Sequence, residues 1–261
     1  MKNYELVLNR VEADLAAGRL RLGERLPGER SLAEQLGISR PSVREAVRVL
    51  EAMGVVRTAT GSGPDAGAVI VAEPASPLTA LLRLHLATNH LPMGDIVQTR
   101  VLLESWAARQ AAARQAARQQ TAEPDGATAP NPIAGDDAGD VPGADRSTDR
   151  AALTVAEGLL DRMDVEGLTP EEFHLLDAEF HVAMAALAGN VLIAAVMSSL
   201  RTAIHGYVLA AVPNLADWDA TAVGLRAEHR AILAAIRAGQ PDDAARLVVD
   251  HIEGFYRAAR L

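Results

Sequence analysis

The chain has 261 residues, of which 49% are hydrophobic and 23% charged, enough for about two domains with buried cores. Cysteine is absent, which excludes a disulfide framework, a thiolate metal site and a cysteine nucleophile. The net charge of -9 excludes a uniformly basic coat, but residues 1–72 carry ten Lys and Arg against nine Asp and Glu, whereas the other 189 carry fifteen against twenty-five. Apolar stretches such as residues 191–200 fall short of the ~20 residues that a membrane span needs. We therefore expect a cytoplasmic protein that does not cross a membrane.

The first part of the chain shows three short helical patterns followed by two β-branched runs. Gly and Pro residues separate these segments, and a glycine-rich stretch joins the two runs. The predicted helices cover 4–19, 29–36 and 40–53, and the predicted strands cover 55–60 and 68–71. Three helices and a two-stranded wing predict a winged helix-turn-helix domain over residues 1–74.

The rest of the chain, residues 75–261, predicts an all-helical bundle, so the fold class is mainly α. Residues 119–149 differ, because they are rich in Ala, Pro, Gly and Asp and lack apolar periodicity. Such a segment buries too little apolar area to offset its ordering entropy, which predicts a disordered insertion. The predicted helices cover 77–89, 93–118, 150–165, 169–188, 190–211, 219–238 and 241–259.

The third helix carries a basic face typical of a DNA-recognition helix. Arg40 and Arg44 are four residues apart and share one side, while Val43 and Leu50 belong to the opposite, apolar side. Arginine binds guanine edges and phosphates through a planar fork, so this helix is expected to enter the major groove. The alternative is a solvated face on which arginines pair with nearby glutamates. The residues expected at DNA are Arg30, Arg40, Ser42, Arg44, Gly61, Ser62 and Gly63.

The pattern resembles the GntR family of bacterial transcription regulators. The matching stretches are Gly23 to Arg30, Leu36 to Ala46 and Leu50 to Gly54. The resemblance implies that Arg30, Arg40, Arg44 and the tip around Gly61 to Gly63 contact DNA. The chain departs from the family pattern at Gly28 and Ser31, where a capping box is lost, and in a longer wing tip.

Four polar residues fall within or beside the apolar stripes of three C-terminal helices: Asp177, His181, His229 and His251. A buried carboxylate needs a partner, which could be a protonated histidine or a divalent metal held by neutral imidazoles. Three inward histidines with a neighbouring Asp-His pair favour the metal, with His174 as a competing ligand. Nitrogen and oxygen ligands suit Zn, with Ni, Mn, Fe or Co as alternatives.

These helices are similar to the ligand-binding FCD domain of FadR-type GntR regulators. The similarity lies in Arg100 to Glu104, Asp177 to His181, Ala188 to Asn190, Glu228 to Ile236, and His251. It implies that Asp177, His181, His229 and His251 bind the metal and that Arg100 holds an effector carboxylate. The alternative for Arg100 is an intrahelical salt bridge to Glu104.

Together these features predict a transcription regulator whose operator affinity depends on a small organic-acid effector, such as a lactate-like hydroxy acid, bound near a divalent metal. A homodimer on near-palindromic double-stranded DNA is the expected assembly. The alternatives are a metal-dependent enzyme for a small carboxylate with an appended DNA-binding arm, and an interaction protein with structural histidines. Against the enzyme, Glu179 and Glu228 are expected to face outward and offer no general base.

Overall fold

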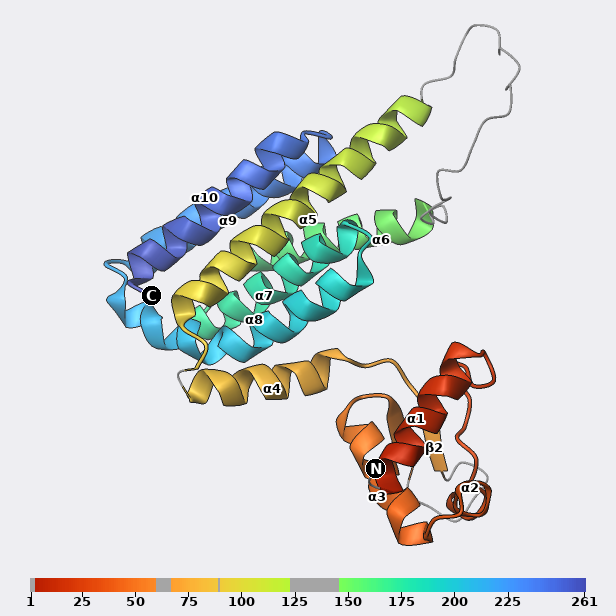
Figure 1. Ribbon diagram of the computed structural model, residues 1–261. Coiled ribbons are helices and arrows are strands. Elements are labelled where there is room, and N and C mark those ends of the chain that lie inside the picture. The colour runs from red at the N-terminus through yellow and green to blue at the C-terminus, as the bar shows by residue number, and fades with distance from the viewer. Residues whose placement is uncertain (1–2, 60–66, 89, 123–145) are drawn as a thin grey trace, which may run out of the picture. The chain divides into compact units, whose positions relative to one another are not determined.

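The computed structural model describes residues 3–59, 67–88, 90–122 and 146–261, and the chain divides into two compact units. Unit 1 spans Met1–Leu81 and unit 2 spans Leu82–Leu261. The division falls inside helix α4, Ala75–Ala87 (Figure 1). Leu86, in the part of α4 that belongs to unit 2, is buried with Ile96 and Leu200 of the same unit.

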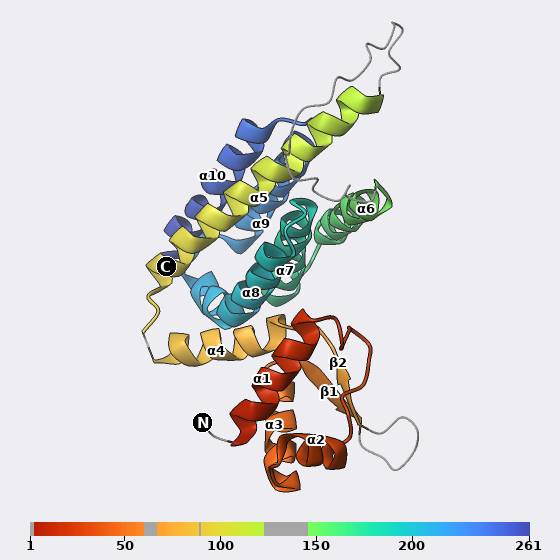
Figure 2. The ribbon, with the colours of Figure 1, turned by 45° about the vertical axis from the view of Figure 1, so that its right-hand side comes forward.

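Unit 1 is a three-helix core with a β-hairpin, as the sequence predicts. Figure 2 shows the two strands side by side next to the helices. They pair antiparallel with Val56 opposite Ile70, and a bridge between Arg25 and Val69 adds a third extended stretch. That bridge was not predicted, because it joins residues 44 positions apart. The elements are α1 (Asn3–Ala16), α2 (Glu29–Leu36), α3 (Arg40–Ala52), β1 (Val56–Ala59) and β2 (Gly67–Ile70).

The boundaries of α3 are fixed by local chemistry at both ends. Ser39 caps the first turn by accepting a hydrogen bond from the backbone N–H of Ser42 at 3.2 Å. Gly54 follows the helix at a positive φ of 68°, where a Cβ would lie 2.3 Å from the carbonyl oxygen of Glu73. Only glycine fits there, so the chain can turn directly from α3 into β1.

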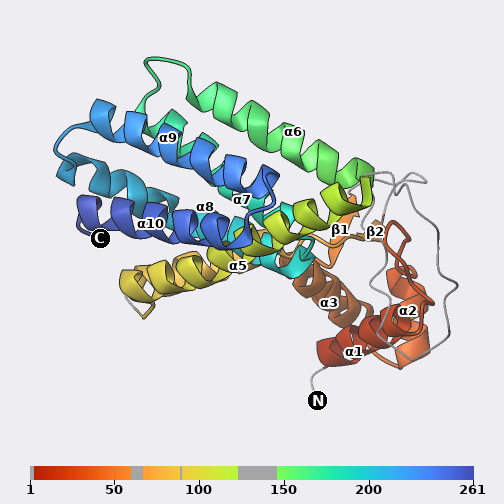
Figure 3. The same cartoon turned by 90° about the horizontal axis from the view of Figure 1, so that it is seen from above.

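Unit 2 is a helical bundle in which α5 packs against α7, α8, α9 and α10 (Figure 3). Its core contains Phe173, Phe180, Ile232, Ile236 and Ile252, all buried. The predicted helices are confirmed with small shifts at their ends, and a short 3-10 turn, η1, is added. The elements are α5 (Met93–Ala122), α6 (Arg146–Met163), α7 (Pro170–Leu187), α8 (Val191–Ala211), η1 (Val212–Asn214), α9 (Trp218–Arg237) and α10 (Pro241–Ala259).

The predicted insertion is shorter at both ends than the sequence suggested. Helix α5 continues to Ala122, where Gln119 donates a hydrogen bond to the carbonyl of Arg237 at 2.8 Å, and α6 already begins at Arg146. The prediction of disorder for 119–122 and 146–149 is therefore wrong. The remainder of that prediction, residues 123–145, lies outside the described residues.

The apolar stretch that contains helix α8 is longer than the sequence analysis expected. Val191–Asn214 is long and apolar enough, by length and composition, to be a candidate membrane span, which corrects the expectation that every apolar stretch is too short. Within the bundle, however, Met197 and Ile204 are buried in the core, and the buried Arg201 pairs with Asp177 of α7. These contacts are those of a core helix.

Candidate functional site

Helix α3, which the sequence predicts to be a DNA-recognition helix, has the expected apolar and basic sides. Val43 and Leu50 are buried in the core of unit 1, while Arg40 and Arg44 are exposed on the other side. Arg40 forms no hydrogen bond or ion pair with any residue that the structure describes. Arg44 instead forms a two-pronged pair with Glu29 of α2, at 3.2 and 2.9 Å. Arg40 is thus free to meet DNA, whereas Arg44 would have to exchange its partner.

The other predicted DNA residues differ in their surroundings. Arg30 pairs with Glu34 across one turn of α2 at 2.9 Å, and both side chains are exposed. The Ser42 hydroxyl lies 2.9 Å from that of the cap residue Ser39. The predicted wing-tip contacts Gly61, Ser62 and Gly63 lie outside the described residues.

In unit 2 the structure brings together all four predicted metal ligands. One potential ligand atom from each of Asp177, His181, His229 and His251 lies within 4.8 Å of the others. The Nε2 atom of His251 is 3.2 Å from Nε2 of His181 and 3.2 Å from Nε2 of His229. Asp177 Oδ1 is 3.0 Å from Nε2 of His229 and 3.4 Å from Nε2 of His181. Helices α7, α9 and α10 therefore aim four donors at one point.

Helix α7 supplies two of these donors, and a capping box fixes where this helix begins. Thr169 accepts a hydrogen bond from the backbone N–H of Glu172 at 3.2 Å, and Glu172 accepts one from the backbone N–H of Thr169 at 2.9 Å. This capping box is followed by His174, Asp177 and His181, three and four residues apart. Such spacing places all three on one side of the helix, and all three are buried.

Carboxylates hold the outer nitrogens of two of the histidines. Nδ1 of His181 pairs with Glu104 of α5, and Nδ1 of His251 lies 2.8 Å from Glu228 of α9. A carboxylate behind an imidazole fixes the ring with its Nε2 lone pair facing inward, as in metal sites with carboxylate-histidine pairs. The expectation that Glu228 faces away from the site is therefore wrong. Its side chain is half exposed, but its carboxylate reaches the cluster.

The acidic groups of the cluster are held in their charged forms. Burial would raise the pKa of Asp177, but Arg201 and His181 outweigh burial and hold that pKa well below its usual value. For Glu104, too, burial opposes ionisation, and Arg100 and His181 lower the pKa despite it. Burial lowers the pKa of His229 and of His251, which favours neutral imidazoles. Neutral imidazoles beside a carboxylate are the protonation states that a divalent metal requires.

The donor set fits a divalent ion. The Nε2 atoms of His181 and His251 lie 3.2 Å apart, and which of them donates depends on the tautomer. In the tautomer that places Nδ1–H toward Glu104 and Glu228, both Nε2 lone pairs face inward, and a cation bound to both would relieve their repulsion. Ligands about 2.1 Å from a tetrahedral ion stand about 3.4 Å apart, close to the observed separations. Neutral nitrogens with one carboxylate suit Zn and its neighbours in the first transition series.

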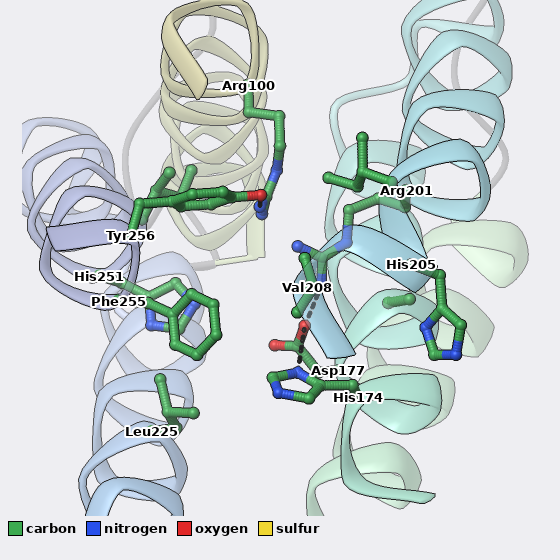
Figure 4. A pocket seen from close by; sticks show the side chains of 13 residues that line it. Arg100, His174, Asp177, Arg201, His205, Val208, Leu225, His251, Phe255 and Tyr256 are labelled. Carbon is green, nitrogen blue, oxygen red and sulfur yellow. Dashed lines mark hydrogen bonds and ion pairs between the residues drawn. The ribbon is translucent and has the colours of Figure 1, made fainter. Parts of the chain in front are cut away.

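A small cavity of about 30 Å³ adjoins this cluster. Figure 4 shows Asp177, His174 and Arg201 on one wall, with Phe255 and Tyr256 of α10 on the other. This volume holds a water molecule but no organic acid, so a ligand could enter only if side chains move apart.

The predicted effector residue Arg100 lines this cavity and also makes the salt bridge named as its alternative. Its Nε lies 2.7 Å from Glu104, and its Nη1 donates to the Tyr256 hydroxyl at 2.9 Å. Burial disfavours the charged guanidinium, but Glu104 and Tyr256 outweigh it and raise the pKa of Arg100. Arg100 is therefore a charged residue that already has two protein partners.

Sequence reasoning did not identify Arg201, which is buried in the cavity wall and pairs with Asp177 Oδ2. The signal was present, because Arg201 is the only Lys, Arg, Asp or Glu in the apolar helix α8. A single arginine within such a helix needs a buried partner, but the helix alone does not reveal which one.

Comparisons with known proteins agree with this architecture. Residues 3–64 match the bacterial regulatory proteins of the gntR family, and residues 143–254 match the FCD domain. The chain is 26% identical to the Glc operon transcriptional activator of Escherichia coli K12, over 95% of this chain and 85% of that protein. It is 34% identical to the Uxu operon regulator of Haemophilus influenzae, over 42% of each.

One solved structure supports the fold. The Streptococcus agalactiae GntR structure superposes with a TM-score of 0.60 at 22% identity, covering 98% of this chain and 99% of that one. The three helices, the wing and the helical bundle with its His and Asp cluster follow the order of the two matched domains. The chain is therefore a DNA-binding transcription regulator of the GntR family that carries an FCD domain.

Proposed function

We propose that this regulator senses a small carboxylate, such as a lactate-like hydroxy acid, in the cavity beside a divalent metal site. The observation that carries the proposal is the convergence of four donor atoms within 4.8 Å next to a cavity lined by two buried arginines. Asp177, His181, His229 and His251 would hold the ion. Four protein donors fill a tetrahedral ion, so oxygen atoms of the effector could bind a held ion only if its coordination number rose to five or six.

Arg201 is the better-placed of the two arginines to receive the effector carboxylate. Its one protein partner among the described residues, Asp177, occupies only part of the guanidinium, so an incoming carboxylate could share Arg201 with Asp177. Arg100 is held by Glu104 and Tyr256 and would add a second positive charge to the lining of the cavity. A planar guanidinium binds carboxylates through two parallel hydrogen bonds, which lysine cannot do.

For DNA, the free Arg40 supports entry of α3 into the major groove. We propose that the protein acts in the cytoplasm as a homodimer on a near-palindromic operator, because two copies related by a two-fold axis present two recognition helices to two half-sites. Effector binding between α7, α8 and α10 would alter the bundle and, through it, operator affinity.

A thermal-shift screen tests the sensor part of the proposal. Small carboxylates are added to zinc-loaded protein and to chelator-treated protein, since a ligand that binds only the folded state raises the melting temperature. We expect stabilisation by a hydroxy acid in the zinc-loaded sample and its loss after chelation. Equal shifts in both samples would contradict a role for the metal, and no shift with any carboxylate would contradict the effector class.

A further inference from the structure

His174 of α7 is a buried histidine without a hydrogen-bond partner. The His174 residue is 4% exposed, and neither nitrogen of its ring lies within hydrogen-bond distance of a partner among the described residues. The nearest polar atom given for it, Oδ2 of Asp177, lies 4.0 Å from Nδ1, too far for a hydrogen bond. Burying a polar group without a partner is costly, so the ring is expected to meet a group that enters the cavity.

Aromatic neighbours hold this ring in place. The centroids of Phe173, Trp218 and Phe255 lie 5.9, 5.3 and 5.4 Å from that of His174. Figure 4 shows the imidazole beside Asp177 at the cavity wall. A ring packed in this way cannot swing toward a protein partner, so its partner has to come to it.

The 4.0 Å gap between His174 and Asp177 has the size of one bridging oxygen. An atom about 2.8–2.9 Å from both Nδ1 and Oδ2 fits between them. Arg201 also pairs with Oδ2, so this carboxylate oxygen accepts hydrogen bonds and does not donate them. In the tautomer with the proton on Nδ1, a bridging group would accept from His174 and donate to Asp177, which a hydroxyl can do and a carboxylate cannot.

We propose that His174 is a specificity-determining residue that recognises the hydroxyl of a 2-hydroxy acid effector, bridged between its Nδ1 and Asp177. The inference rests on the proposed function, because it places the acid in the same cavity. It adds the residue that would recognise the hydroxyl and so distinguish the effector from a plain carboxylic acid of the same length. A water molecule is the competing occupant of the gap, and it would give His174 no influence on selectivity.

The test compares pairs of acids that differ only in the hydroxyl. Lactate and propionate, and malate and succinate, are titrated by calorimetry into zinc-loaded wild type and His174→Phe at one pH. Phenylalanine keeps the aromatic packing but removes both nitrogens. We expect the preference for the hydroxy acid to fall about tenfold in the variant, the worth of one hydrogen bond, with propionate affinity unchanged. An unchanged preference would overturn the inference.

Two further variants locate the nitrogen and guard against misfolding. The amide of His174→Asn can place a donor near the Nδ1 position, whereas that of His174→Gln reaches toward Nε2. We expect the Asn variant to keep more of the hydroxyl preference than the Gln variant. Equal loss in both would overturn the bridge at Nδ1.

A matched control makes the same chemical change elsewhere. His85→Phe alters an exposed histidine of α4 and should leave the preference intact. If wild type binds neither acid of a pair, the proposed effector class fails. If it binds both and the His174 variants keep the preference, only the inference about His174 fails.

Discussion

Arg201 binds one oxygen of Asp177 while the other oxygen faces His229 at 3.0 Å. A single carboxylate therefore belongs to two systems, a buried ion pair with α8 and the proposed metal site with α9. Any change at Arg201 should be felt at the metal site, and removal of the metal should be felt at Arg201.

The role of the cluster in metal binding can be tested by metal analysis. Replacing His229 with Ala should reduce the zinc content of purified protein from about one equivalent toward zero, because it removes one of four donors. Glu228→Gln should weaken zinc affinity by about 10- to 100-fold, because it loosens the ring of His251 from outside. His85→Ala is the control and should keep full occupancy. Unchanged zinc content in the His229 variant would exclude the site.

The ion pair between α7 and α8 can be tested by a double-mutant cycle in chelator. Arg201→Met should destabilise the protein by about 3–5 kcal/mol, because it leaves the Asp177 charge buried without its cation. The double variant Arg201→Met, Asp177→Asn should recover much of that loss. Free energies of unfolding from urea titration give the coupling. Additive losses would mean that the two residues do not form a pair in solution.

The stability of the metal-free protein should fall as the pH is lowered below about 6.5. Burial holds the pKa of His229 and His251 below the ordinary 6.5, so the unfolded chain takes up protons first and is favoured in acid. The pKa values of Asp177 and Glu104 are lowered in the folded protein, so the unfolded chain binds protons at these carboxylates first as the pH falls. This adds a further loss of stability at lower pH. Melting temperatures between pH 8 and pH 5 in chelator measure the effect. The slope should flatten in His229→Phe, and a protein that grows more stable in acid would contradict the assignment.

The exposed Arg40 should carry a DNA contact that can be counted by salt dependence. Arg40→Ala should weaken operator binding and reduce the slope of log affinity against log salt by about 0.9, the contribution of one neutralised phosphate. If Arg40 instead reads a base, affinity should fall without that change in slope. Arg246→Ala, which removes an exposed arginine of unit 2, is the control. Fluorescence anisotropy on a duplex selected from a random pool gives both quantities, and wild-type binding by the Arg40 variant would argue against α3 as the reading helix.

Local patterns were enough to predict the helices and the four clustered donors. Asp177 and His181 share a helical face by spacing alone, and His229 and His251 each fall within an apolar stripe, so tertiary packing had little freedom to separate them. Arg201 could not be assigned in this way, because its partner lies on another helix. Glu228 was misplaced because its helical position is on the exposed side, although its side chain is long enough to reach inward to His251.

Helix α7 carries His174, Asp177 and His181 on the single face that its capping box sets in phase. Each residue added along an α-helix turns the following side chains by about 100°. One extra residue between Thr169 and His174 would thus rotate Asp177, His181 and the proposed hydroxyl-binding His174 out of the site together. Such an insertion would abolish effector binding completely, whereas single substitutions in the other helices could change effector affinity one side chain at a time.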